Sequence, residues 1–120
     1  MILLALLLAT ESPSHPREHP VAALEWLDHY DYCLDVNFAQ VLNTGPQGGR
    51  REAAKRAVVR CWPVHASAGG KLIEHLVRDG GGSDANERQE ITDRMLMTVA
   101  DAFAARVGVR PVDLGPLSPP

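Results

Sequence analysis

Proline and glycine residues cut this chain into segments, and within most of them apolar residues recur at helical spacing. In the longest segment, from Val21 to Leu42, leucine, phenylalanine and valine residues lie three, four or seven positions apart, as on the buried face of an amphipathic helix. Pro20 suits the first turn of such a helix. The pattern predicts an all-α fold, with a buried stripe made of Leu24, Leu27, Leu34, Phe38 and Val41.

A turn-forming stretch at residues 43–49 ends this helix, and the next helical segment begins at Arg50. Pro63 lies inside that segment, where it withholds a backbone donor and pushes on the preceding turn. We therefore expect a kink around Trp62 to Val64. The face expected to be buried carries Ala54, Ala57, Val58, Cys61 and His65.

Glycine residues mark the limits of the last two expected helices. Gly69 and Gly70 precede a two-turn helix at residues 71–79, and Asp84 is a good N-cap for a final helix that ends at Gly108. Glu87 completes a capping pair with Asp84. The buried faces are expected to carry Leu72, Ile73, Leu76 and Val77 in the first helix, and Ile91, Met95, Val99, Ala102, Phe103 and Val107 in the second.

The length of 120 residues leaves room for one core, so residues 1–120 are expected to form a single helical domain. This domain would be a small bundle of about four to five helices with a kinked third helix. It would begin with an apolar helix at residues 1–10 and an extended linker from Thr10 to Pro20, and end in an extended, proline-rich tail at residues 109–120.

The apolar run from Ile2 to Ala9 is too short to span a bilayer, and no basic residue precedes it as in an export signal. We therefore expect a cytoplasmic protein in which Cys33 and Cys61 are reduced thiols. The net charge of -3 gives no long-range attraction for a polyanion, so neither nucleic acid nor a membrane is an expected partner.

Apolar residues cover more of the long helix than one neighbouring helix would bury. Trp26, Tyr30 and Cys33 form a second apolar line beside the stripe. With the N-terminal apolar run and the C-terminal tail, this surplus predicts an intertwined homodimer.

Two mirrored pairs, His29 with Cys33 and Cys61 with His65, each place two metal-ligand types four residues apart. On helices this spacing directs both side chains to the same side, so facing helices could form a Cys2His2 zinc site in a helical regulator. Alternatively, the cysteines are small buried residues and the histidines lie at the rim.

The long helix also carries an acidic line, and the next helix carries a basic one. The two lines either remain solvated or pair with each other and set the orientation of the helices. A third possibility is that the acidic line receives a lysine of a substrate peptide. The acidic residues are Glu25, Asp28, Asp31 and Asp35, and the basic residues are Arg51, Lys55, Arg56 and Arg60.

The stretch RCWPVHA, Arg60 to Ala66, places a cation, a thiol, an indole and an imidazole around the expected kink. Either Trp62 and His65 are core residues, or Trp62 is a pocket wall and His65 a proton carrier. The sequence has no nucleophile elbow, phosphate loop, dinucleotide fingerprint or metalloprotease helix motif.

Residues His19 to Leu42, together with RCWPVHA, resemble the small helical accessory proteins of cinnamycin- and duramycin-type lanthipeptide clusters. The resemblance covers about half of the chain. It implies an enzyme that adds a lysine amine of a modified precursor peptide to a dehydroalanine of the same peptide, forming lysinoalanine without a cofactor.

If the resemblance holds, the precursor peptide would lie in a groove between two subunits. Trp26, Tyr30 and Trp62 would wall the groove, and Arg60 or a backbone amide would stabilise the enolate. His65 is the first candidate for the base and His29 the second. An acidic group on the substrate could take the same role. A helical interaction module without chemistry remains a further alternative.

Overall fold

The computed structural model describes residues 18–120, with side chains from Leu24 onward. The expected N-terminal helix at residues 1–10 lies outside the described residues. All described elements are helical, which confirms the all-α class. They are α2 (Glu18–Asn43), α3 (Gly49–Arg60), α4 (Trp62–Asp79), α5 (Ala85–Val107) and a short 3-10 helix, η1 (Pro111–Leu114).

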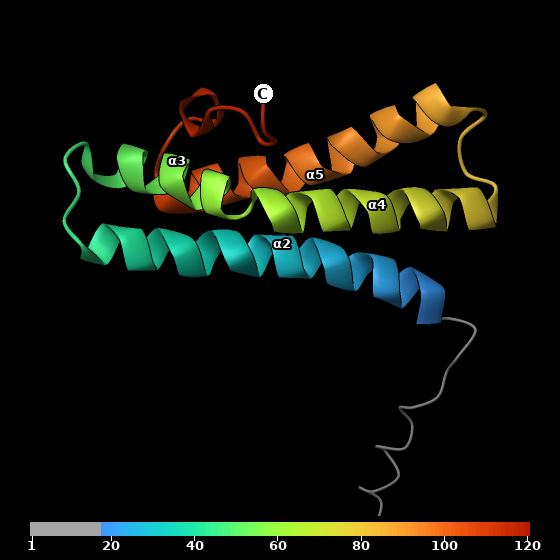
Figure 1. Cartoon of the computed structure of the whole chain (residues 1–120), viewed down its shortest axis with the longest axis horizontal. Coiled ribbons are helices and arrows are strands. Elements are labelled where there is room, and N and C mark those ends of the chain that lie inside the picture. Colours follow the sequence, from blue (N-terminus) through green and yellow to red (C-terminus); the bar gives the residue numbers. More distant parts are fainter. Residues whose placement is uncertain (1–17) are drawn as a thin grey trace, which may run out of the picture.

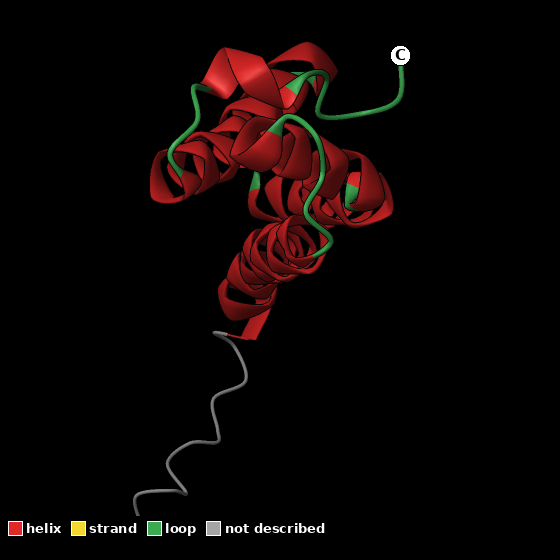
Figure 2. Ribbon diagram, turned by 90° about the vertical axis from the view of Figure 1, so that its left-hand side faces the viewer, coloured by secondary structure: helices red, strands yellow, loops and turns green. Residues whose placement is uncertain are grey.

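The helices form a bundle organised on α2. In Figure 1, α3 and α4 follow one another along the length of α2, and α5 returns behind them. Figure 2 shows α2, which is joined to the grey trace, on one side of the bundle, with the other helices packed over it. The C-terminal segment lies on the opposite side, against α3 and α5.

The start of α2 corrects the expected linker. We expected an extended chain up to Pro20, but the helix begins at Glu18. A proline is tolerated in the first turn because the first backbone N–H groups of a helix have no intrahelical acceptor. The rest of the linker lies outside the described residues.

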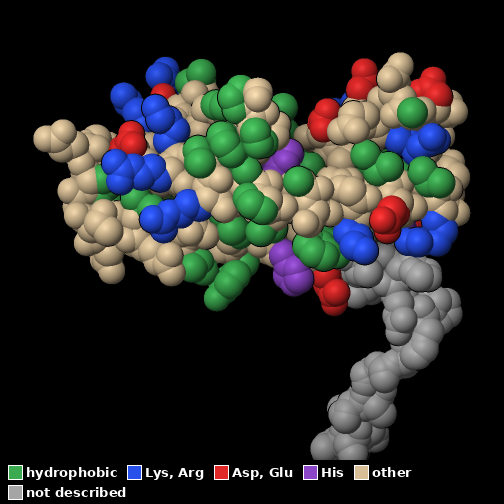
Figure 3. Space-filling view, in the orientation of Figure 1, with side chains coloured by type: hydrophobic (Ala, Val, Ile, Leu, Met, Phe, Trp, Pro, Cys, Tyr) green, Lys and Arg blue, Asp and Glu red, His purple; other side chains and the backbone are tan. Residues whose placement is uncertain are grey.

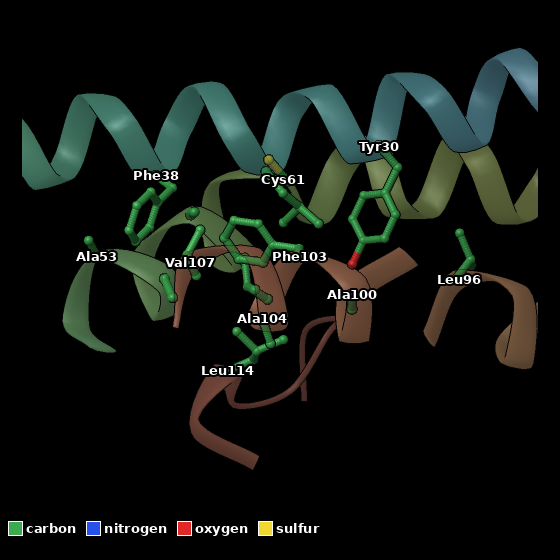
Figure 4. Packing of buried hydrophobic residues seen from close by; sticks show 14 of the residues in the cluster. Tyr30, Phe38, Ala53, Cys61, Leu96, Ala100, Phe103, Ala104, Val107 and Leu114 are labelled. Atoms are coloured by element: carbon green, nitrogen blue, oxygen red, sulfur yellow. The ribbon is translucent and has the colours of Figure 1, made fainter. Parts of the chain in front are cut away.

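The core lies between one face of α2 and the three later helices. Leu34, Phe38 and Val41 are buried as expected, but Leu24 is 56% exposed, so its placement in the stripe was wrong. The rings of Phe38 and Phe103 meet edge to face with centroids 5.9 Å apart, as Figure 4 shows. Opposite α2, α3 buries the small residues Ala53, Ala54 and Ala57, which allow the two helices to pack closely.

The chain leaves α3 at Cys61 and starts α4 at Trp62. Pro63 therefore lies in the first turn of α4. Backbone N–H groups there have no acceptor within the helix, so the missing N–H of proline costs no hydrogen bond. The N–H of His65 then donates to the carbonyl of Cys61 at 2.9 Å. The boundary separates the alanine-rich α3 from the part of α4 that carries the candidate histidine.

Gly69 and Gly70 do not interrupt the helix, contrary to the expected start of a separate helix at Lys71. A glycine in a helix interior costs only about 1 kcal/mol relative to alanine, and packing compensates for it here. The neighbouring Ala68 and Leu72 are buried in the core. A Cβ atom on Gly69 would lie 3.5 Å from Leu96 Cδ1, so α4 and α5 approach closely at this point.

The ends of α5 match the expectation. The Asp84 side chain accepts a hydrogen bond from the N–H of Glu87 at 2.9 Å, and the Glu87 carboxylate accepts from the N–H and hydroxyl of Ser83, each at 2.6 Å. Gly108 ends the helix with φ at 81°, a conformation that glycine adopts without strain.

The buried face of α5 is rotated from the expected one. Small residues at Ala100 and Ala104 are buried, and they let α5 pack closely against its neighbours. The expected face was right at Phe103 and Val107 but displaced by one residue in the earlier turns, where Ile91, Met95 and Val99 were expected. The buried residues are Thr92, Leu96, Ala100, Phe103, Ala104 and Val107, whereas Ile91, Met95 and Val99 are half-buried and Ala102 is exposed.

The C-terminal tail is not simply extended. It forms η1, and Leu114 is buried against the bundle while Val112 is 75% exposed. Arg50 of α3 links the end of α5 to α2. Its Nε donates to the carbonyl of Val107 at 2.7 Å, and its guanidinium lies 5.5 Å from the Phe38 ring centroid.

Cys33 and Cys61 form a disulfide, with Cα atoms 6.1 Å apart. The expectation of two reduced thiols was therefore wrong, because the two helices bring these residues together across a sequence separation of 28. The Asn37 amide donates to both sulfur atoms, at 3.4 Å and 3.6 Å. The disulfide joins α2 to the junction of α3 and α4.

Within residues 18–120, no helix has the length and apolar character needed to cross a membrane.

The glycine pair gives a test of the continuous α4. Replacing Gly70→Ala adds a methyl group that meets no atom within 4 Å, so we expect the free energy of unfolding to rise by about 0.5–1 kcal/mol. Gly69→Ala should gain a similar amount, since its Cβ would meet Leu96 at an ordinary contact distance of 3.5 Å, whereas the larger side chain of Gly69→Leu should destabilise the fold. Urea denaturation of the three variants measures this order. A loss of stability in Gly70→Ala would contradict the continuous helix.

The disulfide gives a second test. Closing a loop with a sequence separation of 28 stabilises a fold by roughly 3–4 kcal/mol in the chain-entropy treatment. We expect a reductant to lower the midpoint of urea unfolding in the wild type but to leave the double variant Cys33→Ala/Cys61→Ala unchanged. Two titratable thiols in the native protein, purified without reductant, would show that the bond does not form.

Candidate functional site

The most chemically distinctive cluster joins α2, α4 and α5 around His65. His65 lies in the first turns of α4 and is half-buried, with its ring packed edge-on against Tyr30 of α2 at a centroid distance of 5.2 Å. Asp93, on the exposed side of α5, acts on it electrostatically. The fold thus brings together Tyr30 and His65, two candidates that are distant in the sequence.

Tyr30 itself is fully buried, so it lies beneath the surface of this single copy instead of lining a groove on it. Figure 4 shows its hydroxyl directed towards α5, near Ala100. Among the described residues the hydroxyl has no hydrogen-bond partner. Burial raises the pKa of Tyr30 well above its ordinary value, so the phenol stays protonated and neutral.

Burial favours the neutral form of the His65 imidazole. Burial lowers the pKa of His65 below the ordinary value of 6.5, and the negative charge of Asp93 opposes this shift without cancelling it. A neutral imidazole can accept a proton near neutral pH. The arrangement can therefore supply a general base that is half accessible from solvent.

The two candidates Trp26 and His29 form a separate pair on α2. Their rings meet edge to face with centroids 5.2 Å apart. Trp26 is half-buried against the core, and His29 is exposed. Both lie within about one helical turn of Tyr30 along α2.

Trp62 is held by the C-terminal tail. Its Nε1 donates to the carbonyl of Pro116 at 3.1 Å, and its ring is half-buried against the core. The tail thereby fixes one indole at the start of α4, three positions from His65. No sequence pattern predicts this contact, since any backbone carbonyl can accept such a bond.

Arg60 does not join the other candidates in one depression. It is exposed at the end of α3, in a shallow groove of about 320 Å³ lined by Glu52, Lys55, Arg56, Val59 and Arg60. None of the aromatic or histidine candidates lines this groove. A direct role for Arg60 beside His65 would require the substrate to extend from one helix to the next.

The acidic line of α2 pairs with α5, and no ion pair joins it to the basic line of α3 among the described residues. Arg106 donates to Asp31 at 2.7 Å and to Asp35 at 2.9 Å. These bonds, with Asp35 the larger contributor, raise the pKa of Arg106 above its ordinary value. Glu25 and Asp28 remain exposed further along α2.

The proposed zinc ligands do not form a metal site. The sulfur atoms of Cys33 and Cys61 are bonded to each other, so neither is a thiolate ligand. From Leu24 to the C-terminus, no group of three or more histidine, cysteine, aspartate or glutamate side chains is placed to hold a metal ion. Of the four residues in the two mirrored pairs, the structure shows only the cysteines in contact, and their chemistry is a disulfide.

Comparison of the chain with protein-family models, curated proteins and solved structures finds no match.

The shifted pKa of His65 predicts a pH dependence of stability. Because folding lowers this pKa, the unfolded chain binds a proton over a range in which the folded chain does not, so protonation favours unfolding. We expect the free energy of unfolding to be unaffected by His65 above pH 6.5 and to decrease as the pH falls below that value. Urea denaturation at a series of pH values measures the change.

His65→Gln is the control, since it removes the titrating group and should abolish this part of the decrease. Two carboxyls, the exposed Glu87 and the half-buried Asp113, have pKa values lowered by hydrogen bonds from Ser83 and Arg110. They titrate below their ordinary values of 4.5 and 3.8, outside the His65 range. Identical curves for the variant and wild type between pH 6.5 and 4.5 would refute the assignment.

Proposed function

We propose that the protein is a biosynthetic enzyme for a ribosomal peptide natural product, forming lysinoalanine by adding a lysine amine to dehydroalanine. The observation that carries the proposal is the half-buried imidazole of His65, whose pKa is lowered by burial. A base of this kind suits a reaction that has to remove a proton from an amine near neutral pH. The resemblance of the segments 19–42 and 60–66 to lanthipeptide accessory proteins supports the same reaction.

The chemistry requires few protein groups. The neutral lysine nitrogen attacks the β-carbon of dehydroalanine, the nitrogen loses a proton to His65, and the α-carbon of the resulting enolate takes up a proton. The product is an isomer of the substrate, and no cofactor is consumed. A free lysine has a pKa near about 10.4, so desolvation or a base is needed. Holding two distant peptide positions together could supply much of the rate.

A second copy of the chain would complete the site in this proposal. Leu24 and Tyr32 on α2 are 56% and 70% exposed, and apolar surface of this kind favours an interface between copies. The resulting groove would use Trp26 and Trp62 as walls, while Tyr30 supports His65 from beneath. Arg60, on α3, would contact the precursor peptide beyond the reacting residues.

A helical interaction module without chemistry of its own is the second candidate. The exposed side chain of Val77 favours it because this residue lies more than three helical turns from His65 on α4 and adds apolar surface that catalysis does not need. This candidate needs a peptide or protein partner but no proton transfer. It predicts that His65 can be replaced without loss of binding.

The test uses a dehydrated, thioether-cyclised lanthipeptide precursor that contains a lysine and is encoded beside the gene. Incubation with the protein should leave the peptide mass unchanged and make the lysine resistant to amine labelling. His65→Gln should slow this change by about a hundredfold or more, the usual contribution of a general base. His29→Gln decides whether the second histidine takes part.

His75→Gln is the matched control, because His75 lies on the same helix and pairs with Asp79 at 3.3 Å. It should keep the wild-type rate. Thermal unfolding of each variant separates a lost base from a lost fold. Persistent labelling with every neighbouring precursor would end the enzyme proposal, and binding of a precursor without reaction would favour the interaction module.

A further inference from the structure

Lysine and arginine are unevenly distributed over the helices. The sequence of α2 contains neither residue, whereas α3 carries five in twelve residues, all of them exposed. Figure 3 shows these basic side chains gathered over the α3 end of the molecule. A protein of net charge -3 thus presents one strongly cationic face. We call this the α3 face; its cations are Arg50, Arg51, Lys55, Arg56 and Arg60.

The α3 face is hollowed along its C-terminal half. The groove of about 320 Å³ has Val59 at 46% exposure among the long side chains of Lys55, Arg56 and Arg60. The aliphatic stems of lysine and arginine can cover an apolar group while their charged ends remain in water. The groove therefore offers an aliphatic floor with a cationic rim.

The cations on this face differ in how far other groups of the chain engage them. Arg50 donates to a backbone carbonyl, Arg51 lies 3.8 Å from Asp113, and Arg56 pairs with Glu52 at 2.9 Å. Lys55 and Arg60 have no carboxylate within salt-bridge distance among the described residues. Lys55 and Arg60, which no group among the described residues engages in an ion pair, both line the groove.

A second depression, of about 440 Å³, continues the cationic surface at the N-terminal half of α3. It is lined by Arg50, Arg51, Gly108, Val109, Arg110 and Asp113. The C-terminal segment forms its far wall, since Gly108 and Arg110 follow the end of α5. Positive charge thus extends along the whole of α3.

We propose that the α3 face is a docking site for an acidic peptide segment that places an aliphatic side chain over Val59. Carboxylates on either side would pair with Lys55 and Arg60. Nucleic acid fits less well because α2, alongside α3, carries a row of carboxylates, and no aromatic side chain lines the groove to stack on a base. The acidic peptide would thus match the groove in two ways, with its carboxylates on the cationic rim and its aliphatic side chain on Val59.

The test measures fluorescence anisotropy of a short fluorescein-labelled peptide with one leucine set among glutamates. We expect saturable binding that weakens as salt is added. The double variant Lys55→Glu/Arg60→Glu should weaken it by about tenfold or more, since two attractive ion pairs are replaced by two repulsive ones. Arg78→Glu/Arg94→Glu, with the same change in net charge on other exposed sites, should bind as the wild type does.

Three results would overturn the proposal. Equal binding of a peptide with serine in place of leucine would remove the role of the Val59 floor. A single-stranded oligothymidylate that binds more tightly than the peptide would assign the face to nucleic acid. Self-association that disappears in Lys55→Glu/Arg60→Glu would assign it to a second copy. The binding assay requires no cross-linking reaction and no role for His65, so this proposal and the proposed function can fail separately.

Discussion

Burial of one face of α2 is the interaction on which the rest of the structure depends. Helices α3, α4 and α5 each contact α2, and Tyr30, Leu34 and Phe38 provide the largest side chains of that contact. Burial of such a side chain stabilises a fold by roughly 1.5–3 kcal/mol. Two further links act at the edges of the same face, namely the disulfide to the start of α4 and the bonds from Arg106 on α5. A change that disrupts the buried face of α2 would therefore weaken the packing of α3, α4 and α5 together.

The properties of the candidate site follow from the same packing. The ring of Tyr30, which is buried in the core, also packs nearly at right angles against the ring of His65. Desolvation lowers the pKa of the imidazole more than Asp93 raises it. The basicity of His65 is thus set by the fit of α2 against α4. Any change that loosens this fit would return the imidazole towards its behaviour in water.

The sequence predicted best what depends on local chemistry. The last helix begins after Asp84 and ends before Gly108, where capping rules placed its ends. Prediction from the sequence failed where tertiary packing determines the structure. Gly69 is helical because α5 packs against it, and the core side of α5 follows small residues such as Ala100. The approach of Cys33 to Cys61 could be anticipated from their spacing on facing helices, but the choice between thiols, zinc and a disulfide requires the distance between them.

The carboxylates of α2 and the cations of α3 face different parts of the molecule. Opposite charges on consecutive helices left open whether α2 pairs with α3, and in the structure α5 supplies the partner of Asp31 and Asp35 through a single arginine. The cations of α3 are then turned outwards, and among the described residues only Glu52 and Asp113 form ion pairs with them. A half-buried base on α4 and a cationic groove on α3 consequently occupy separate surfaces. A peptide long enough to reach both would be held by charge at one site while it is chemically accessible at the other.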